Sequence, residues 1–441
     1  MIESLKELIE YKKSRGKLIV VKDLQRYLEP TRFILKAERD RKTIIFNLKD
    51  SVLTCVSNVV YSREDLLNIL NVKSDEDLYA RITKLINEGF RDSVKGYVDK
   101  GFFNLREFSE YFEIRQLELK QLPSIKFYPK DGGEYITSAI IIAEIPTMKA
   151  HYNASIHRLM LMGNKGYAVR LVPRHLYNIY KANSSKGLET PIAIVIGVNP
   201  ALLLLSATSP PYGVFELMGY KLIFNKPLDV ALTPKYGIPV PVSASVVMEA
   251  RITLDLVEEG PFVDLLKLYD RVRRQPLIKV DAIYVNKVYE PYFHVILPGG
   301  IEHRIFMGVP REASIWDGVR RVVPNVVKVR LTPGGGSWLN AVIAIRKVSE
   351  GEGKLAIMAA FASHPSLKHV VVVDDDIDPD NPLDVEWAIA TRFQASKDLV
   401  LIYEAKGSTL DPSSKDGITD KLGIDATMPL KERERFIRPT I

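Results

Sequence analysis

Apolar residues recur at helical and strand spacings through the first hundred residues, and this pattern predicts an α/β unit there. Ser4 precedes the first helical pattern and favours a helix N-terminus, while Gly16 ends it. Residues 91–106 carry no strong pattern. The predicted helices are 4–15, 31–40, 63–71 and 75–90, and the predicted strands are 17–21, 43–46 and 52–56.

From about Leu119 the pattern changes to short apolar runs separated by Gly, Pro and Asp, which is typical of strands. Two of these runs flank a Gly-Asn-Lys-Gly turn at 163–166 and predict a hairpin. The predicted strands of this region are 136–145, 156–162, 167–173, 191–198, 246–257 and 292–297, with a helix at 176–186.

The last third returns to a mixed pattern. A buried strand at 368–374 runs into Asp374-Asp-Asp-Ile-Asp378, and the segment around Lys421 is expected to be a polar tail. The other predicted strands are 326–331, 340–345 and 399–404, and the predicted helices are 354–361 and 385–392.

The 441 residues exceed one compact core, so we expect two or three domains. The 46% hydrophobic and 26% charged residues are ordinary for a globular protein, and we expect no membrane span and no secretion signal. One cysteine excludes an internal disulfide and a thiolate cluster, which favours the cytoplasm. The net charge of +7 is spread along the chain, which argues against nucleic-acid binding and suits an anionic ligand.

The predicted hairpin brings together groups that can bind a metal. Asn153 at one end and His175 at the other offer an amide oxygen and an imidazole, with Arg158 close by. Glu216 adds a carboxylate, and this oxygen and nitrogen set would suit Mn²⁺ or Mg²⁺. The alternative is a surface hairpin whose basic residues face solvent.

Two acidic clusters are further candidates. Glu258, Glu259 and Asp264 surround a Gly-Pro-Phe turn, where carboxylates repel one another and one can keep its proton near neutral pH. A solvated acidic turn is the alternative. The Asp374–Asp378 run could hold a divalent metal or form a structural network with Arg392 and Lys397.

Taken together, these segments resemble the UbiD family of reversible decarboxylases, which use prenylated flavin mononucleotide. The resemblance covers most of the chain. Two positions depart from the family's Asn-x-Gly-x-Tyr-Arg motif, because Ser155 replaces its Gly and His157 replaces its Tyr. The matching segments are Asn153–Arg158, Pro173–His175, Gly197–Pro200, Gly213–Glu216, Glu259–Asp264, Asp374–Asp378, Asp384–Arg392 and Lys421–Thr427.

The resemblance implies a complete site. Asn153, His175 and Glu216 would hold Mn²⁺, and Ser206 and Thr208 are candidates for K⁺. Arg158 and Glu259 would form the catalytic network with Asp264, the proton donor. The residues implied for the flavin are Ile156, His157, Arg158, Arg170, Leu171, Val172, Arg174, His175, Glu216 and Lys421.

The resemblance also implies a reaction, the removal of CO₂ from an α,β-unsaturated acid. Gln is sparse while Ile, Val, Lys and Arg are plentiful, a composition typical of thermophiles. With the length, it suggests an archaeal member that converts trans-anhydromevalonate 5-phosphate to isopentenyl phosphate in a modified mevalonate route to isoprenoids. An aromatic acid such as 4-hydroxy-3-polyprenylbenzoate is the alternative substrate. A catalytically silent flavin-binding assembly subunit is the alternative of a different class. A flavin prenyltransferase would supply the cofactor.

The fold implied by the resemblance is α/β with three domains. Residues 1–112 would form an N-terminal α/β domain, and 113–300 a central split β-barrel, similar to flavin reductases, that binds the flavin and the metal. Residues 301–441 would form a C-terminal α/β domain with a tail that mediates homo-oligomer formation.

Overall fold

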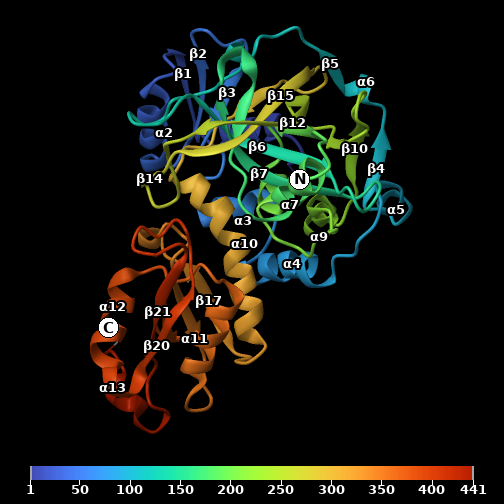
Figure 1. Ribbon diagram of the computed structural model, residues 1–441. Helices are drawn as coiled ribbons and strands as arrows, with labels where there is room; N and C mark the ends of the chain where they lie inside the picture. The colour runs from blue at the N-terminus through green and yellow to red at the C-terminus, as the bar shows by residue number, and fades with distance from the viewer. Residues whose placement is uncertain (1, 440–441) are drawn as a thin grey trace. The chain divides into compact units, whose positions relative to one another are not determined.

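The computed structural model describes residues 2–439. The chain divides into two compact units, residues 1–306 and 307–441, and the division lies inside helix α10 (Ile301–Arg320). Figure 1 traces the elements of each unit.

The first unit begins with a four-stranded sheet in the order β1-β2-β3-β16. Its strands are β1 (Leu18–Leu24), β2 (Thr43–Leu48), β3 (Thr54–Ser57) and β16 (Tyr292–His294). Helix α1 (Leu5–Ser14) starts as predicted, because the Ser4 hydroxyl accepts the N–H of Glu7. The other helices of this part are α2 (Glu29–Arg39), α3 (Arg63–Leu70) and α4 (Asp75–Glu88).

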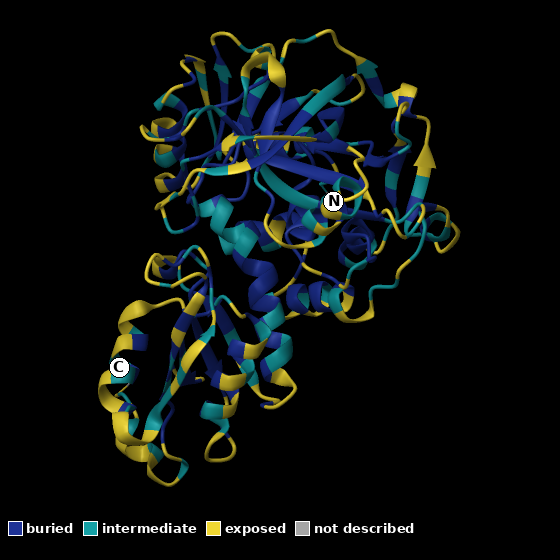
Figure 2. Ribbon diagram, in the orientation of Figure 1, coloured by how far each residue is buried: buried dark blue, intermediate teal, exposed yellow. Residues whose placement is uncertain are grey.

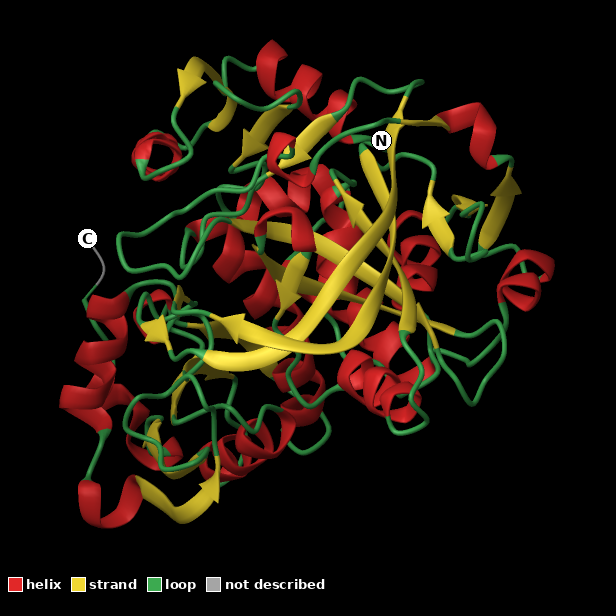
Figure 3. Cartoon of the chain, turned by 45° about the horizontal axis from the view of Figure 1, so that its top comes forward, coloured by secondary structure: helices red, strands yellow, loops and turns green. Residues whose placement is uncertain are grey.

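A closed antiparallel barrel follows, which confirms the predicted fold class (Figures 1 and 3). The strands run in the order β12-β9-β6-β7-β8-β15, and pairing of β12 with β15 closes the ring, while β5 extends from β15. The bounds are β5 (Phe112–Ile114), β6 (Tyr135–Glu144), β7 (Tyr152–Leu161), β8 (Tyr167–Val169), β9 (Thr190–Ile196), β12 (Val246–Glu259) and β15 (Arg273–Asn286).

Smaller elements surround the barrel. Segment 91–106, which has no clear sequence pattern, contains α5 (Val94–Asp99) and β4 (Phe103–Arg106). A three-stranded sheet joins β4 to β10 (Leu228–Leu232) and β11 (Pro239–Pro241). The remaining elements are α6 (Phe108–Tyr111), α7 (His175–Ser184), α8 (Pro200–Ser206), α9 (Gly219–Phe224), β13 (Phe262–Val263) and β14 (Tyr269–Asp270).

One apolar core holds the first unit together. It runs from the N-terminal sheet, with Phe46 and Cys55, into the barrel, with Ile141 and Ile194. Figure 2 shows the barrel strands as mainly buried. Burial of this surface at about 25 cal/mol per Å² is the main force that fixes the strand register.

The second unit is a five-stranded sheet in the order β17-β18-β19-β21-β20. Its strands are β17 (Val326–Leu331), β18 (Asn340–Ile345), β19 (His369–Asp374), β20 (Leu399–Lys406) and β21 (Ile418–Ala426), and its helices are α11 (Glu352–Ser363), α12 (Pro382–Arg392) and α13 (Ala395–Asp398). The expectation of a polar tail around Lys421 is wrong, because this segment is β21, paired with strands on both sides.

Arg392 organises the acidic run of the second unit. Its guanidinium donates to Asp374 at 3.2 Å and to Asp376 at 3.0 and 2.5 Å. Lys328 pairs with Asp378 at 2.6 Å. These ion pairs agree with the structural alternative for Asp374–Asp378, and no group of three His, Cys, Asp or Glu within residues 2–439 could hold a metal.

In the part of the chain that the structure describes, no helix is both long and apolar enough to span a membrane. The division of residues 1–306 into domains at 112 and 300 stays a prediction, as does a role of the last domain in oligomer formation.

Candidate active site

The predicted hairpin is present, and it places Arg158 in the barrel wall. Strands β7 and β8 pair from Leu159 with Val169 to Leu161 with Tyr167, around the short helical turn Gly163–Lys165. The second strand is shorter than predicted and ends at Val169. The hairpin is therefore part of a closed barrel, not a surface feature.

Arg158 grips Glu259 with two parallel hydrogen bonds. Nε donates to Oε1 at 2.8 Å and Nη2 donates to Oε2 at 3.0 Å. The Arg158 side chain is 10% exposed and that of Glu259 is fully buried. Burial alone would lower the pKa of Arg158, but the charge and hydrogen bonds of Glu259 raise it above its usual range. The pair is a strong, geometrically fixed ionic contact.

Two more carboxylates bind the same guanidinium. Nη1 donates to Asp264 at 3.1 Å, and Nη2 donates to Asp270 at 3.1 Å. Arg158 thus uses four of its five N–H groups, and within residues 2–439 one N–H of Nη1 is left without an acceptor. The structure brings together Arg158, Glu259 and Asp264 as predicted. Glu258 lies on β12 opposite Arg274 of β15.

Asp270 is the member that sequence reasoning missed. It lies on β14, and it also accepts from Arg273 at 2.6 Å and lies 3.8 Å from the Nε of Arg170. Burial would raise the pKa of Asp270, but the Arg273 hydrogen bond and the charge of Arg158 hold it below its usual range. The sequence does place Asp270 three residues before Arg273, a spacing at which the two side chains can pair. The contact of Asp270 with Arg158, however, depends on the β13–β14 hairpin.

A tight turn between β12 and β13 positions the network. Gly260 has φ +98°, a conformation that favours glycine, and the Gly260–Pro261 peptide is cis. Phe262 follows, and the Arg158 guanidinium lies 4.5 Å above its ring centroid. Gly132 packs against this turn, where its N–H donates to the Pro261 carbonyl at 2.7 Å.

Gly132→Ala should therefore damage the site, because a Cβ there would lie 1.9 Å from the carbonyl oxygen of Gly260. We expect a loss of about 1–3 kcal/mol in the free energy of unfolding, measured by denaturant melts. Gly334→Ala is the matched control, since a Cβ there meets nothing within 4 Å. Equal stability of the two variants would contradict this account of the turn.

Two of the predicted metal ligands, Asn153 and His175, converge on the third, Glu216. Asn153 Nδ2 donates to Oε1 at 2.6 Å, the N–H of Ala154 donates to Oε2 at 2.7 Å, and His175 Nδ1 lies 3.8 Å from Oε1. Glu216 is 2% exposed, and desolvation raises its pKa, although His175 acts in the opposite direction. A buried carboxylate beside an imidazole and an amide fits a divalent cation, which would compensate the buried charge.

Ser155 and His157 form a second hydrogen-bonded group next to Asn153. The Ser155 hydroxyl lies 2.9 Å from His157 Nε2 and 3.3 Å from Asn153 Oδ1. His157 Nδ1 lies 3.1 Å from the carbonyl oxygen of Arg170. Desolvation lowers the pKa of His157 to about 4, so the imidazole is neutral near pH 7.

The other predicted flavin residues lie on or beside the hairpin. Ile156 is on β7, and Leu171 is buried and donates its N–H to Gln275 at 2.8 Å. Val172 is 44% exposed. Arg174 is the N-cap residue of α7, without a capping hydrogen bond from its side chain. Desolvation lowers the pKa of its guanidinium, which forms no ion pair within residues 2–439.

Lys421, Ser206 and Thr208 complete the predicted set. Lys421 belongs to the second unit, where it is buried and donates to the carbonyls of Pro365 and Leu367 at 2.8 and 2.5 Å. Thr208 donates to the Leu205 carbonyl at 2.6 Å, while the buried Ser206 hydroxyl has no hydrogen-bond partner among the described residues. Their roles stay predictions.

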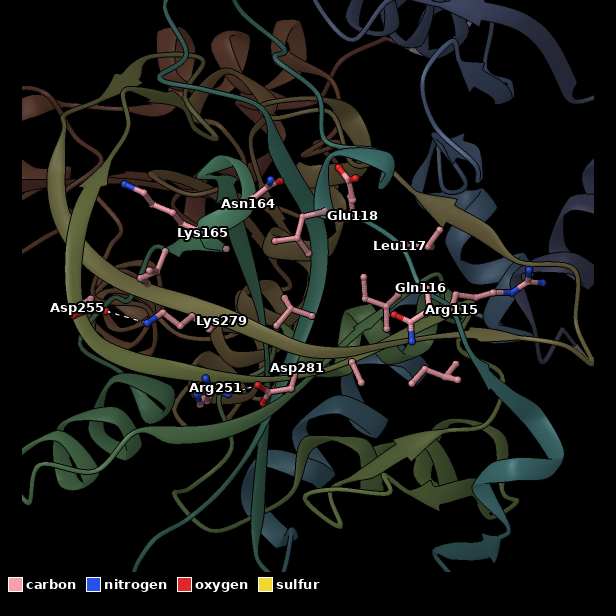
Figure 4. A pocket seen from close by; sticks show the side chains of 17 residues that line it. Arg115, Gln116, Leu117, Glu118, Asn164, Lys165, Arg251, Asp255, Lys279 and Asp281 are labelled. Atoms are coloured by element: carbon pink, nitrogen blue, oxygen red, sulfur yellow. Dashed lines mark hydrogen bonds and ion pairs between the residues drawn. The ribbon is translucent and has the colours of Figure 1, made fainter.

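A groove of about 690 Å³ lies elsewhere on the first unit (Figure 4). Segment 114–119 and strand β15 line it, and its described lining residues include none of the predicted site residues. Two ion pairs lie in its lining, Lys279 with Asp255 at 3.4 Å and Arg251 with Asp281. The Arg158 network therefore remains the candidate active site.

Comparison with known proteins shows the family of the chain. Residues 104–301 match the UbiD 3-octaprenyl-4-hydroxybenzoate carboxy-lyase Rift-related domain, and residues 304–426 match the C-terminal domain of the same family. An anhydromevalonate phosphate decarboxylase of Aeropyrum pernix is 46% identical over 427 residues, 97% of this chain and 93% of the relative. The chain belongs to the UbiD family. It is an enzyme of the decarboxylase class, as the resemblance predicted.

Other relatives cover almost the whole chain as well. The anhydromevalonate phosphate decarboxylase of Methanothermobacter thermautotrophicus is 38% identical over 423 residues, 96% of each chain. A UbiD-class enzyme of Pelotomaculum thermopropionicum, HmfF, solved in complex with FMN, is 34% identical with a TM-score of 0.91, over 99% of this chain and 97% of that one. An evolved dimeric form of HmfF, solved with prFMN, is 31% identical with a TM-score of 0.86, over 100% and 97%.

Proposed function

We propose that this UbiD-family enzyme removes CO₂ from trans-anhydromevalonate 5-phosphate to give isopentenyl phosphate. The observation that carries the proposal is the 46% identity, over almost the full length, to a relative of that activity. The complete network of Arg158, Glu259 and Asp264 supports an active enzyme over a silent assembly subunit.

Prenylated FMN is the proposed cofactor. When bound, it supplies the electron sink that loss of CO₂ from an unsaturated acid requires. Arg174 fits its phosphate, because a desolvated guanidinium without an ion-pair partner among the described residues gains most from an anion. Arg170 would serve beside it, since its own charge is only partly balanced by Asp270 at 3.8 Å.

Mn²⁺ is the proposed metal, held by Asn153, His175 and Glu216. The set supplies an amide oxygen, an imidazole nitrogen and a carboxylate, which are ligands that suit this ion. Bound there, the ion would neutralise Glu216 and attract the flavin phosphate.

The chain's own residues divide the remaining work. The free N–H of Arg158 Nη1 would hold the substrate carboxylate, and the paired Glu259 keeps the guanidinium in place. Once CO₂ has left, Asp264 would donate its proton to the substrate carbon that carried the carboxylate. A C–H bond would then replace the C–C bond that joined this carbon to the carboxylate. Asp264 is 24% exposed, which gives it access to solvent for recovering a proton.

Four finer assignments belong to the same proposal. A flavin prenyltransferase would supply the cofactor, K⁺ would bind at Ser206 and Thr208, the enzyme would self-associate, and it would act in the cytoplasm. The unpartnered Ser206 hydroxyl supports the cation site, and the dimeric HmfF form supports self-association.

CO₂ release from trans-anhydromevalonate 5-phosphate tests the function directly. Protein co-produced with a flavin prenyltransferase and given Mn²⁺ without oxygen should release CO₂, and release should depend on both additions. Turnover of 4-hydroxy-3-polyprenylbenzoate in its place would refute the proposed substrate but support the proposed decarboxylation. Protein that binds no flavin would favour the silent subunit.

A further inference from the structure

The two departures from the family's first motif lie on one face of strand β7. Side chains alternate along a strand, so Asn153, Ser155 and His157 point to the same side of the barrel wall. Hydrogen-bond contacts join them in that order, from Asn153 Oδ1 through the Ser155 hydroxyl to His157 Nε2. A candidate metal ligand is thus the first member of a chain of hydrogen bonds.

The far end of this chain fixes the direction of its protons. A backbone carbonyl can only accept, so His157 Nδ1, 3.1 Å from the Arg170 oxygen, must carry the ring proton. The imidazole is neutral, and its Nε2 is therefore an acceptor. The Ser155 hydroxyl is the donor that faces it at 2.9 Å.

Ser155 has a single proton to give. The contact with His157 at 2.9 Å has the length of a good hydrogen bond, whereas 3.3 Å to Asn153 Oδ1 is long for an O–H donor. The Ser155 hydroxyl therefore donates its hydrogen bond to His157, and the lone pairs of Asn153 Oδ1 receive no hydrogen bond from it. Asn153 Nδ2 meanwhile donates to Glu216 at 2.6 Å.

We propose that His157 and Ser155 are positioning residues for the cation, in which His157 holds the Ser155 proton away from Asn153 Oδ1 so that this oxygen is free to bind metal. The inference rests on the proposed metal site. It explains together why histidine and serine replace the tyrosine and glycine of the family motif, because both are needed to keep Asn153 Oδ1 free for the metal.

Mn²⁺ titration of the FMN-loaded protein tests the proposal, with free Mn²⁺ followed by electron paramagnetic resonance. His157→Phe removes the acceptor, so the Ser155 proton should turn to Asn153 and raise the Kd for Mn²⁺ roughly 3- to 10-fold. The Ser155→Ala/His157→Phe double variant removes that proton and should return the Kd toward the wild-type value. Ser155→Ala alone should change it by less than about 2-fold.

A double variant that binds as weakly as His157→Phe would overturn the proposal, because the ring would then act only by packing. Unchanged affinity in His157→Phe would overturn it too, with the metal site intact. Wild-type protein that binds no Mn²⁺ would instead refute the metal in the proposed function.

The tautomer can be read without metal, from ring ¹⁵N shifts of histidine-labelled wild-type protein. We expect a proton on Nδ1 and a bare Nε2 at His157, identified by the signal missing in His157→Phe. A proton on Nε2 would overturn the inference, whatever the Mn²⁺ result, since the ring would then donate to Ser155.

Discussion

Asp264→Asn should abolish turnover while flavin binding persists. In the wild-type protein Arg158 Nη1 lies 3.1 Å from the Asp264 carboxylate, and the asparagine oxygen of the variant can still accept this hydrogen bond. The variant side chain, however, has no acidic proton to donate. Because general acid catalysis contributes about 10²–10⁴-fold, CO₂ release should fall at least 100-fold. The measurement is the rate of CO₂ release, with bound flavin determined by absorbance.

Asp255→Asn is the matched control for this substitution. Asp255 is on the same barrel, its side chain is 65% exposed, and it pairs only loosely with Lys279 at 3.4 Å. That variant should release CO₂ at the wild-type rate. If Asp264→Asn also kept most of its rate, Asp264 would not be the proton donor.

Arg158→Ala should cost stability as well as activity. Glu259 is fully buried, and its charge is held by two hydrogen bonds from this guanidinium. Removing one partner of a buried pair leaves an uncompensated charge, which typically costs about 3–5 kcal/mol. Chemical denaturation of flavin-free protein should show this loss, and turnover should be undetectable.

Two further variants separate the buried charge from general damage. Arg251→Ala removes an arginine of the same barrel that is 32% exposed, and it should cost about 1 kcal/mol or less. Arg158→Ala/Glu259→Gln should recover part of the lost stability, because it removes the unpaired carboxylate. A double variant no more stable than Arg158→Ala would refute the electrostatic explanation.

The sequence was most informative where the pattern was local. The hairpin, with Arg158 on one strand, and the strand that leads to Glu259 were predictable, because apolar periodicity and turn residues specify neighbours along the chain. Membership in the UbiD family, predicted from the motifs, was confirmed over most of the chain.

The misses have physical reasons as well. Asp270 reaches Arg158 only through the β13–β14 hairpin, a two-residue pairing that leaves no periodic pattern. Helix α10 is absent from the predicted helices because it contains Pro310, and a proline in the sequence usually indicates the end of a helix. Strand β21 alternates buried and exposed residues but carries Lys421 and Asp425, so it resembled a solvated tail until its sheet partners were known.

The alternation along β7 also limits how this enzyme can evolve. Asn153, Ser155 and His157 occupy one face of the strand, and Arg158, the next residue, faces the other. Insertion of one residue in the loop before β7 would leave these faces unchanged, whereas insertion of one residue between His157 and Arg158 would bring Arg158 to the face of the other three side chains. The proposed metal ligand Asn153 and the proposed catalytic residue Arg158 therefore depend on the register of the same strand.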